Sequence, residues 1–306
     1  RPDPVAPPAH LRLSATGLRM ERRRIDLLRQ TRPRGLPGRH FAQDRLPAAT
    51  RIRIAQDRRH LPALQTAGSP QRAGRTIQKV PFSIENTHYV PLKYEFIEYS
   101  MAVCRLMGFT DVCGVNATGR DLGAQLYGGL IDRDGYSILN YNVGVFNGEG
   151  INTKDKNKSK DVVARLMVQP LRALSFAGYY YWGEVGADYA RRTRYGGGVC
   201  YDDGRWIARG EYIAGRTGIV SPDVAAPFDS RGYYAMAACW VTPKWLPAAR
   251  FEQFDEVAAA RQTNYTAGVT WQPFKHLRCQ LNYTYEQYGG TNPDRNVVKA
   301  MLTGIF

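Results

Sequence analysis

Cationic side chains recur on the polar side of several segments in which polar and apolar residues alternate. They are Arg165, Arg209, Arg250, Arg278 and Lys299. A guanidinium group presents a planar fork of N–H donors that matches the oxygens of a phosphate or a carboxylate. These residues could therefore select anions. Glu211, Glu252 and Glu286 occupy equivalent positions, so ion pairing between neighbouring side chains is an alternative of equal weight.

The residue types that catalysis needs are sparse after residue 75. Hydrolysis by a serine or a carboxylate requires a general base such as histidine, and this part of the chain has only His88 and His276. The first falls in a predicted long loop and the second in a short turn, so no catalytic pair is expected. The glycines of residues 195–200 lack the following lysine of a phosphate-binding loop. We predict that the protein is not an enzyme and has no catalytic residue and no cofactor.

The chain has five cysteines, which is an odd number. They are Cys104, Cys113, Cys200, Cys239 and Cys279. Their spacing lacks the close pairs of a zinc site, so no metal site is predicted. Only Cys104 and Cys113 are near each other in the sequence, and both a disulfide between them and two free thiols are open interpretations.

The segments that must position the cationic side chains are predicted to be β-strands. From residue 75 onward, apolar and polar residues alternate with a period of two, which is the side-chain period of a strand. In residues 262–272, for example, Tyr265 and Trp271 share one face, whereas Asn264 and Thr270 share the other. No helix is predicted. The twelve predicted strands are residues 75–84, 119–131, 136–147, 161–170, 172–183, 194–202, 205–215, 231–242, 246–255, 262–272, 276–287 and 296–306.

Short and long connections alternate between these strands. The short ones are residues 132–135, 169–172, 202–205, 242–245 and 272–276, and the long ones are 147–160, 183–193, 216–230, 255–262 and 288–295. Tight turns at one end and long loops at the other are typical of outer-membrane β-barrels. The strand lengths suit a bilayer, which a tilted strand crosses in about nine to eleven residues. We therefore expect the apolar faces to contact lipid and the polar faces to line a water-filled interior.

Motifs between Lys79 and Tyr212 resemble the phosphate-selective porin O and P family. They are QKVPFSIEN (78–86), GFTDVCGVNATGRDLGAQLYG (108–128), GYSILNYNVGVFNGEGINTKDKNKSKDVVARL (135–166), FAGYYYWGE (176–184) and YDDGRWIARGEYI (201–213). The resemblance implies a transmembrane antiparallel β-barrel of about sixteen strands, with a long loop folded into the interior after the fifth strand. That constriction loop would span about residues 84–119 and follow the strand at 75–84 as the fifth, and the first four strands, which the family has ahead of Arg75, are missing. The final Phe306, on the apolar face of the last strand, resembles the end of such barrels.

The beginning of the chain has a different composition. Residues 1–75 contain seventeen Arg, five acidic residues and no Lys, Tyr or Trp, which gives a net charge of +12, whereas the rest of the chain carries +3. We therefore separate residues 1–74 from a porin barrel at residues 75–306. Disorder and translation in a wrong reading frame are both open for the first part. A nucleic-acid-binding arm would usually carry Lys as well, and we predict no nucleic-acid partner.

The resemblance adds three cations to the candidates for anion binding, because they lie in or beside the predicted constriction loop. The full set is Lys93, Arg105, Arg120, Arg165, Arg209, Arg250 and Arg278. Carboxylates are close by in the same loop, which weakens an interpretation of strict phosphate specificity. These carboxylates are Glu85, Glu95, Glu98 and Asp111.

Together these patterns predict a porin in the lipid of the cell outer membrane. It would allow passive diffusion of small hydrophilic solutes, with anions such as phosphate among them, and would form a homotrimer, as the resemblance implies. The alternative is a truncated or frameshifted barrel fragment with no transport activity. An unpaired first strand would leave backbone groups unsatisfied in lipid, at a cost of several kcal/mol for each group. We therefore expect poor closure between residues 75–84 and 296–306.

Overall fold

The computed structural model describes residues 51–53, 71–89, 93–107, 110–113, 119–151, 153–220, 226–256, 259–290 and 292–305. The chain separates into two units, residues 1–47 and residues 48–306, and all described residues belong to the second. Most of the segment 1–74 lies outside the described residues. The same is true of Phe306, the predicted terminal aromatic residue.

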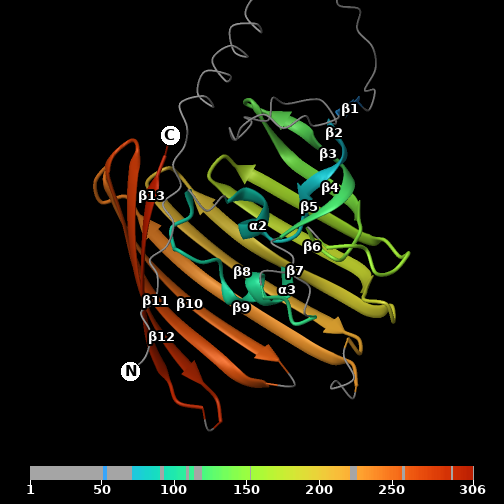
Figure 1. Cartoon of the computed structure of the whole chain (residues 1–306). Helices are drawn as coiled ribbons and strands as arrows, with labels where there is room; N and C mark the ends of the chain where they lie inside the picture. The colour runs from blue at the N-terminus through green and yellow to red at the C-terminus, as the bar shows by residue number, and fades with distance from the viewer. Residues whose placement is uncertain are drawn as a thin grey trace, which may run out of the picture. The chain divides into compact units, whose positions relative to one another are not determined.

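Twelve long strands follow one another in one antiparallel sheet, and each pairs with its neighbours along the chain (Figure 1). They are β2 (Gln71–Lys79), β3 (Arg120–Arg133), β4 (Tyr136–Phe146), β5 (Asp161–Leu171), β6 (Leu174–Val185), β7 (Ala190–Asp202), β8 (Trp206–Thr217), β9 (Phe228–Cys239), β10 (Trp245–Glu256), β11 (Ala259–Phe274), β12 (Leu277–Tyr288) and β13 (Arg295–Gly304). The all-β fold and the place of every predicted strand are confirmed. A short strand that the sequence did not predict, β1 (Arg51–Arg53), pairs in parallel with the start of β2.

The predicted alternation of short and long connections is wrong at two places. The connections expected at 183–193 and 255–262 are tight, because β6 continues to Val185 before β7 begins, and β10 continues to Glu256 before β11 begins. The ladder extends to the pairs Val185↔Ala190 and Glu256↔Ala259. The polar composition of these residues suggested a loop, but their backbones pair as strands. This pairing provides hydrogen bonds for their N–H and C=O groups.

The apolar face of the sheet is the exposed one. In β11, the side chains of Tyr265 and Trp271 are 48% and 39% exposed, whereas Asn264 and Thr270 are buried. The predicted orientation is thereby confirmed, with apolar residues facing outward and polar residues facing inward. An outward apolar face is favourable in lipid and costly in water.

The segment between β2 and β3 lies against the inner face of the sheet and forms two short helices, which the sequence did not predict. They are α2 (Ile84–His88) and α3 (Met101–Met107), and α3 contacts β8, β9 and β10 (Figure 1). The strand expected to reach residue 84 ends at Lys79, because Pro81 has no N–H for the ladder and Ser83 turns the chain with a φ of 70°. No helix in the described residues is long and apolar enough to cross a bilayer.

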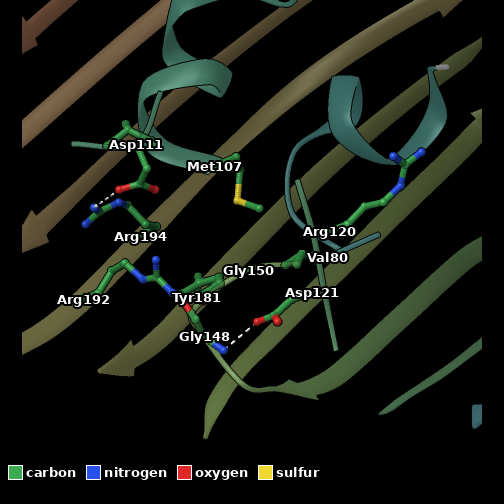
Figure 2. A pocket seen from close by; sticks show the side chains of 11 residues that line it. Val80, Met107, Asp111, Arg120, Asp121, Gly148, Gly150, Tyr181, Arg192 and Arg194 are labelled. Atoms are coloured by element: carbon green, nitrogen blue, oxygen red, sulfur yellow. Dashed lines mark hydrogen bonds and ion pairs between the residues drawn. The ribbon is translucent and has the colours of Figure 1, made fainter. Parts of the chain in front are cut away.

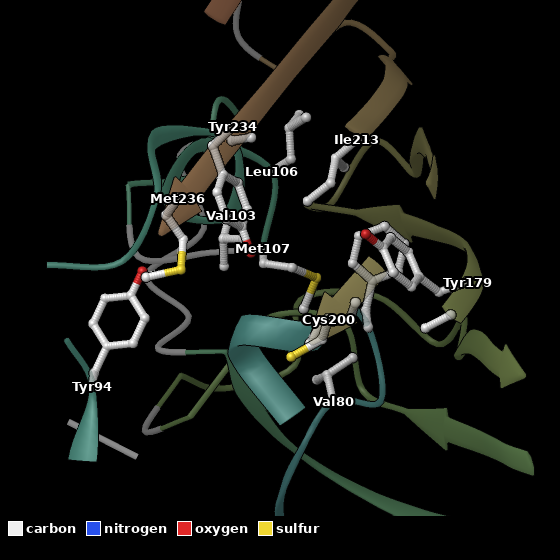
Figure 3. Close-up of a cluster of buried hydrophobic side chains, with 14 of the residues drawn as sticks. Val80, Tyr94, Val103, Leu106, Met107, Tyr179, Cys200, Ile213, Tyr234 and Met236 are labelled. Atoms are coloured by element: carbon white, nitrogen blue, oxygen red, sulfur yellow. The ribbon is translucent and has the colours of Figure 1, made fainter. Parts of the chain in front are cut away.

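A hydrophobic core fills the space between this segment and the sheet (Figure 3). Val103 and Leu106 of α3 are fully buried in it, and the strands contribute Ile213, Tyr234 and Met236. The expectation of inner faces that are polar throughout is therefore wrong. Apolar residues are tolerated there because the segment between β2 and β3 shields them from water.

The two ends of the series of strands do not meet within the described part of the chain. Strand β13 pairs only with β12, and β2 pairs with β3 and with β1. The predicted lack of closure between the first and last strands of the barrel is confirmed for these residues.

Candidate functional site

Glu211 on β8 anchors the start of the inner loop, which we define as residues 80–119. Its buried carboxylate accepts hydrogen bonds from the backbone N–H groups of Ile84 and Glu85 and from the hydroxyl groups of Ser83, Tyr179 and Tyr234. The donor–acceptor distances run from 2.6 Å for the two tyrosines to 3.2 Å for the serine. A buried carboxylate needs such donors to replace its water, so Glu211 holds the loop tightly to the wall.

Arg209, also on β8, pairs with two carboxylates of the inner loop. Its Nη2 atom lies 2.9 Å from Oε2 of Glu95 and 3.7 Å from Oε1 of Glu85. Its guanidinium carbon lies 3.8 Å from the centre of the Tyr89 ring, which is a cation–π geometry. The residue as a whole is only 2% exposed. Arg209 thus holds the inner loop, and its charge is already compensated.

Arg250 on β10 binds the middle of the inner loop in a similar way. It lies 2.8 Å from Glu252 on the same strand, and it donates hydrogen bonds to the hydroxyl of Tyr94 at 3.1 Å and the carbonyl of Glu98 at 2.9 Å. Glu252 in turn accepts a hydrogen bond from the N–H of Met101 at 2.6 Å, at the start of α3. Two wall residues therefore fix both the turn before α3 and the helix itself.

A second polar network lies beside the end of the inner loop (Figure 2). Arg192 pairs with Asp161 at 2.6 Å, and Arg194 lies 3.7 Å from Asp111. Arg192, Arg194 and Asp111 line a cavity of about 20 Å³. This space holds about one water molecule, so it is not a route for a larger solute.

The remaining predicted cations lie at several separate places. Lys93 is exposed on the inner loop, and Arg120, the first residue of β3, borders the small cavity (Figure 2). Arg165 on β5 donates a hydrogen bond to the hydroxyl of Thr87 in α2. Arg105 on α3 lies 2.7 Å from Glu256.

Arg278 on β12 donates a hydrogen bond to the carbonyl of Tyr94. Together with Arg209 and Arg250 it surrounds the residues around Tyr94, so these three predicted cations do lie together. Lys93, Arg120 and Arg165 are not part of this group of arginines. Within the part of the chain that the structure describes, none of these last three takes part in an ion pair with a carboxylate.

A larger cavity, of about 500 Å³, lies between the inner loop and the strands β10 to β13. Tyr99 and Arg105 line it from the loop, and Asn264, Thr284 and Lys299 line it from the sheet. The Nζ atom of Lys299 lies 2.6 Å from Oε2 of Glu98, which joins the last strand to the loop. This cavity is large enough for a small hydrophilic solute.

The sequence did not single out Arg192 and Arg194 as candidates, although both are buried on the inner side of β7. The predicted connection at 183–193 hid the start of this strand. If residues 190–193 had been included in the strand, the period of two would have placed Arg192 on the same face as Arg194, the first residue of the predicted strand at 194–202. The partners from the inner loop had no such signal, because Glu95 lies 114 residues before Arg209 in the chain.

All five cysteines are free thiols, so the disulfide between Cys104 and Cys113 is not formed. Burial raises the pKa of the Cys104 thiol to about 12 and that of the Cys113 thiol to about 11. Both thiols are therefore protonated and unreactive at neutral pH. No group of three or more potential metal ligands occurs among the described residues.

An exposed apolar face, a charged and polar inner face and a loop packed against that inner face are features of a transmembrane β-barrel. A family model matches the sequence of the second half of the sheet. Residues 179–304 match the phosphate-selective porin O and P family, which confirms the predicted family for these residues. The motifs that suggested it lie mostly earlier, between residues 78 and 213, and overlap with the match only from residue 179.

Two solved structures are similar to this chain. An anion-selective porin from Comamonas acidovorans is 12% identical, with a TM-score of 0.49, and the match covers 65% of this chain and 62% of that one. Another porin is 12% identical, with a TM-score of 0.42, and the match covers 64% of this chain and 71% of that one. The chain thus spans less than two thirds of the anion-selective porin. No curated protein matches the sequence significantly.

Proposed function

We propose that this protein is an outer-membrane porin through which small hydrophilic solutes diffuse passively, with anions such as phosphate among them. The proposal rests on one observation, a sheet with an apolar outer face and a polar, charged inner face. Residues such as Leu166 and Leu281 expose about half of their side-chain surface on the outer face, whereas Arg209 and Arg250 are buried on the inner face. The apolar face of such a sheet is favoured by contact with a bilayer, and its opposite face borders a polar space.

The solute route in this proposal passes the cavity of about 500 Å³ beside the inner loop. Its walls include Asn264, Thr266 and Thr284 on neighbouring strands, which offer hydrogen bonds to a hydrated solute. The small cavity near Arg192 and Asp161 does not contribute a route. Diffusion along this path requires neither a catalytic residue nor a cofactor.

Attraction of anions toward the interior, outside the cavity of about 500 Å³, is assigned in this proposal to Lys93, Arg120 and Arg165, which do not line that cavity and have no carboxylate partner among the described residues. Arg209 and Arg250 instead hold the inner loop, because each is paired with a buried carboxylate. A compensated cation attracts an anion weakly. The proposed selectivity for anions is therefore modest. Assembly into a homotrimer is part of the proposal on the basis of the family.

Conductance across planar lipid bilayers tests the proposal. The refolded full chain is expected to give discrete channel steps in KCl and a reversal potential that favours chloride. The substitution Arg165→Gln should reduce this preference, whereas Arg172→Gln, in the exposed turn between β5 and β6, should not change it. Block of the chloride current by phosphate would support the phosphate assignment.

Folded protein without channel steps would contradict the porin function and would support a barrel fragment with no transport activity. Circular dichroism that retains the strand signal distinguishes this outcome from misfolding. A reversal potential that Arg165→Gln leaves unchanged would contradict the assigned anion contact alone.

A further inference from the structure

The cavity of about 500 Å³ beside the inner loop carries both signs of charge in equal number. Its lining includes the cations Arg105, Arg250 and Lys299 and the carboxylates Glu98, Glu252 and Glu286. Three positive and three negative groups give the lining a formal charge of zero. The cavity therefore has no net attraction for an anion, although single charges of both signs reach its surface.

Two ion pairs in this lining differ in their exposure to solvent, and therefore in how readily they can open. Arg250 and Glu252 are buried, with side chains 5% and 2% exposed, and both also bind the backbone of the inner loop. Lys299 and Glu98 are 41% and 59% exposed. An exposed ion pair is weak because water screens it and because two long side chains must be ordered. The pair of Lys299 and Glu98 can therefore open toward a ligand while the buried pair stays in place.

Apolar side chains flank the ion pair of Lys299 and Glu98. Ile97 precedes Glu98 in the inner loop, and Val297 precedes Lys299 by two positions, which places it on the same face of β13. Tyr99 and Met101 line the cavity from the loop. A ligand that meets both charges would thus rest its remaining atoms against an apolar surface.

We propose that this cavity binds small zwitterionic solutes with an apolar side chain, which is the chemistry of a free α-amino acid or a short peptide. The solute carboxylate pairs with Lys299, and its ammonium group pairs with Glu98. The two charged groups of an α-amino acid are attached to the same carbon atom, so they can meet two wall charges whose Nζ and Oε2 atoms lie 2.6 Å apart. The inference rests on the proposed porin function and specifies a class of solute for it.

The same lining disfavours a small inorganic anion at this place. Phosphate could pair with Lys299 only by displacing Glu98, which would leave that carboxylate without its partner and close to the anion. Like charges at short distance repel each other, and the apolar side chains cannot form hydrogen bonds with phosphate to replace its water. A zwitterion leaves no wall charge unpaired.

Isothermal titration calorimetry on the refolded full chain in detergent tests the proposal. The probes are leucine, N-acetyl-leucine, which lacks the ammonium group, leucine methyl ester, which lacks the carboxylate, and inorganic phosphate. Leucine is expected to bind at least tenfold more tightly than any of the other three. Affinity for leucine that is equalled by phosphate or by N-acetyl-leucine would overturn the proposal, as would an absence of leucine binding.

Variants locate the site. Lys299→Gln and Glu98→Gln should each weaken leucine binding at least tenfold, and the exposed turn variant Lys275→Gln should leave it unchanged. The charge exchange Glu98→Lys with Lys299→Glu should restore binding, because it keeps one group of each sign. Unchanged affinity in both single variants would place the ligand elsewhere and overturn the assignment.

Conductance in KCl with the same preparation separates this inference from the porin function. Channel steps without leucine binding would overturn the class of solute and leave the porin function in place. Leucine binding without channel steps would support the site and contradict the porin function.

Discussion

Glu211 is a single buried carboxylate that receives five hydrogen bonds, three of them from residues 83–85 of the inner loop. The substitution Glu211→Gln keeps the size of the side chain but turns one acceptor atom into a donor. Each buried hydrogen bond that is lost costs about 1–3 kcal/mol. We expect the inner loop to loosen and cleavage by proteases within residues 80–119 to accelerate at least tenfold.

Limited proteolysis of the folded protein measures this effect. Glu286→Gln is the matched control, because Glu286 is only partly buried and accepts a hydrogen bond from Tyr288 on its own strand. If the two variants were cleaved at the same rate, Glu211 would not be the anchor of the loop.

The thiols of Cys104 and Cys113 predict a dependence on pH. Burial is the main cause that raises their pKa values, to about 12 and about 11. The neutral thiol is therefore favoured in the folded state, and this contribution to stability is present at neutral pH and is lost as the pH rises through these values. Alkylation of both thiols in the folded protein should be slow at pH 7 and about tenfold faster for each unit of higher pH, because only the thiolate reacts.

Mass spectrometry of the alkylated peptides checks this prediction, with denatured protein as the reference for full reactivity. Rapid alkylation of the folded protein at pH 7 would show that these thiols are not buried as described.

At the scale of elements, the inner loop is closed where it rejoins the sheet. The Nδ2 atom of Asn86 donates hydrogen bonds to the carbonyl of Val80 at 2.9 Å and to that of Gly119 at 3.0 Å, so one side chain joins both ends of the loop. Gly119 has a φ of 66°, and a Cβ atom there would lie 2.1 Å from Oδ1 of Asn86. The loop therefore needs glycine for its backbone conformation and for the close approach.

Gly119→Ala is expected to lower the free energy of unfolding by about 1–3 kcal/mol for the backbone strain, and by more for the displaced Asn86. Gly204→Ala is the control, because Gly204 has a φ of 88° in a turn with nothing within 4 Å of its would-be Cβ atom. Urea unfolding followed by tryptophan fluorescence measures both variants. Equal losses would indicate that the contact with Asn86 has no energetic role.

The strands could be predicted from the sequence, but most of the site could not. A period of two is a local signal, and it placed Arg209, Arg250 and Glu211 on the inner face correctly. Their partners depend on contacts between distant parts of the chain, such as that of Arg209 with Glu95. The helices α2 and α3 are short, and packing against the sheet stabilises them more than their own sequence does. The predicted anion-binding role of the cations stays a prediction.

At the scale of the whole sheet, the exposed apolar face predicts a strong dependence on the lipid. Leu281 on β12 is 49% exposed on that face, and Leu281→Arg should cost about 2–4 kcal/mol if the position lies near the middle of the bilayer. Thr284→Arg, on the same strand but in the lining of the inner cavity, should cost much less. Folding into lipid vesicles at increasing urea concentration measures the difference, and equal midpoints for the two variants would contradict the assignment of the faces.

Arg250 and Glu252 both hold the inner loop and face the larger cavity, but other residues have one of these roles. Glu211 and Arg209 hold the loop from β8, whereas Lys299 faces the cavity from β13, and Glu98 has an exposed side chain. Mutations at the second pair can change the solutes that enter without loosening the loop. For the proposed porin, substitutions at Lys299 and Glu98 could therefore alter the preferred solute while the contacts of Glu211 and Arg209 with the loop remain.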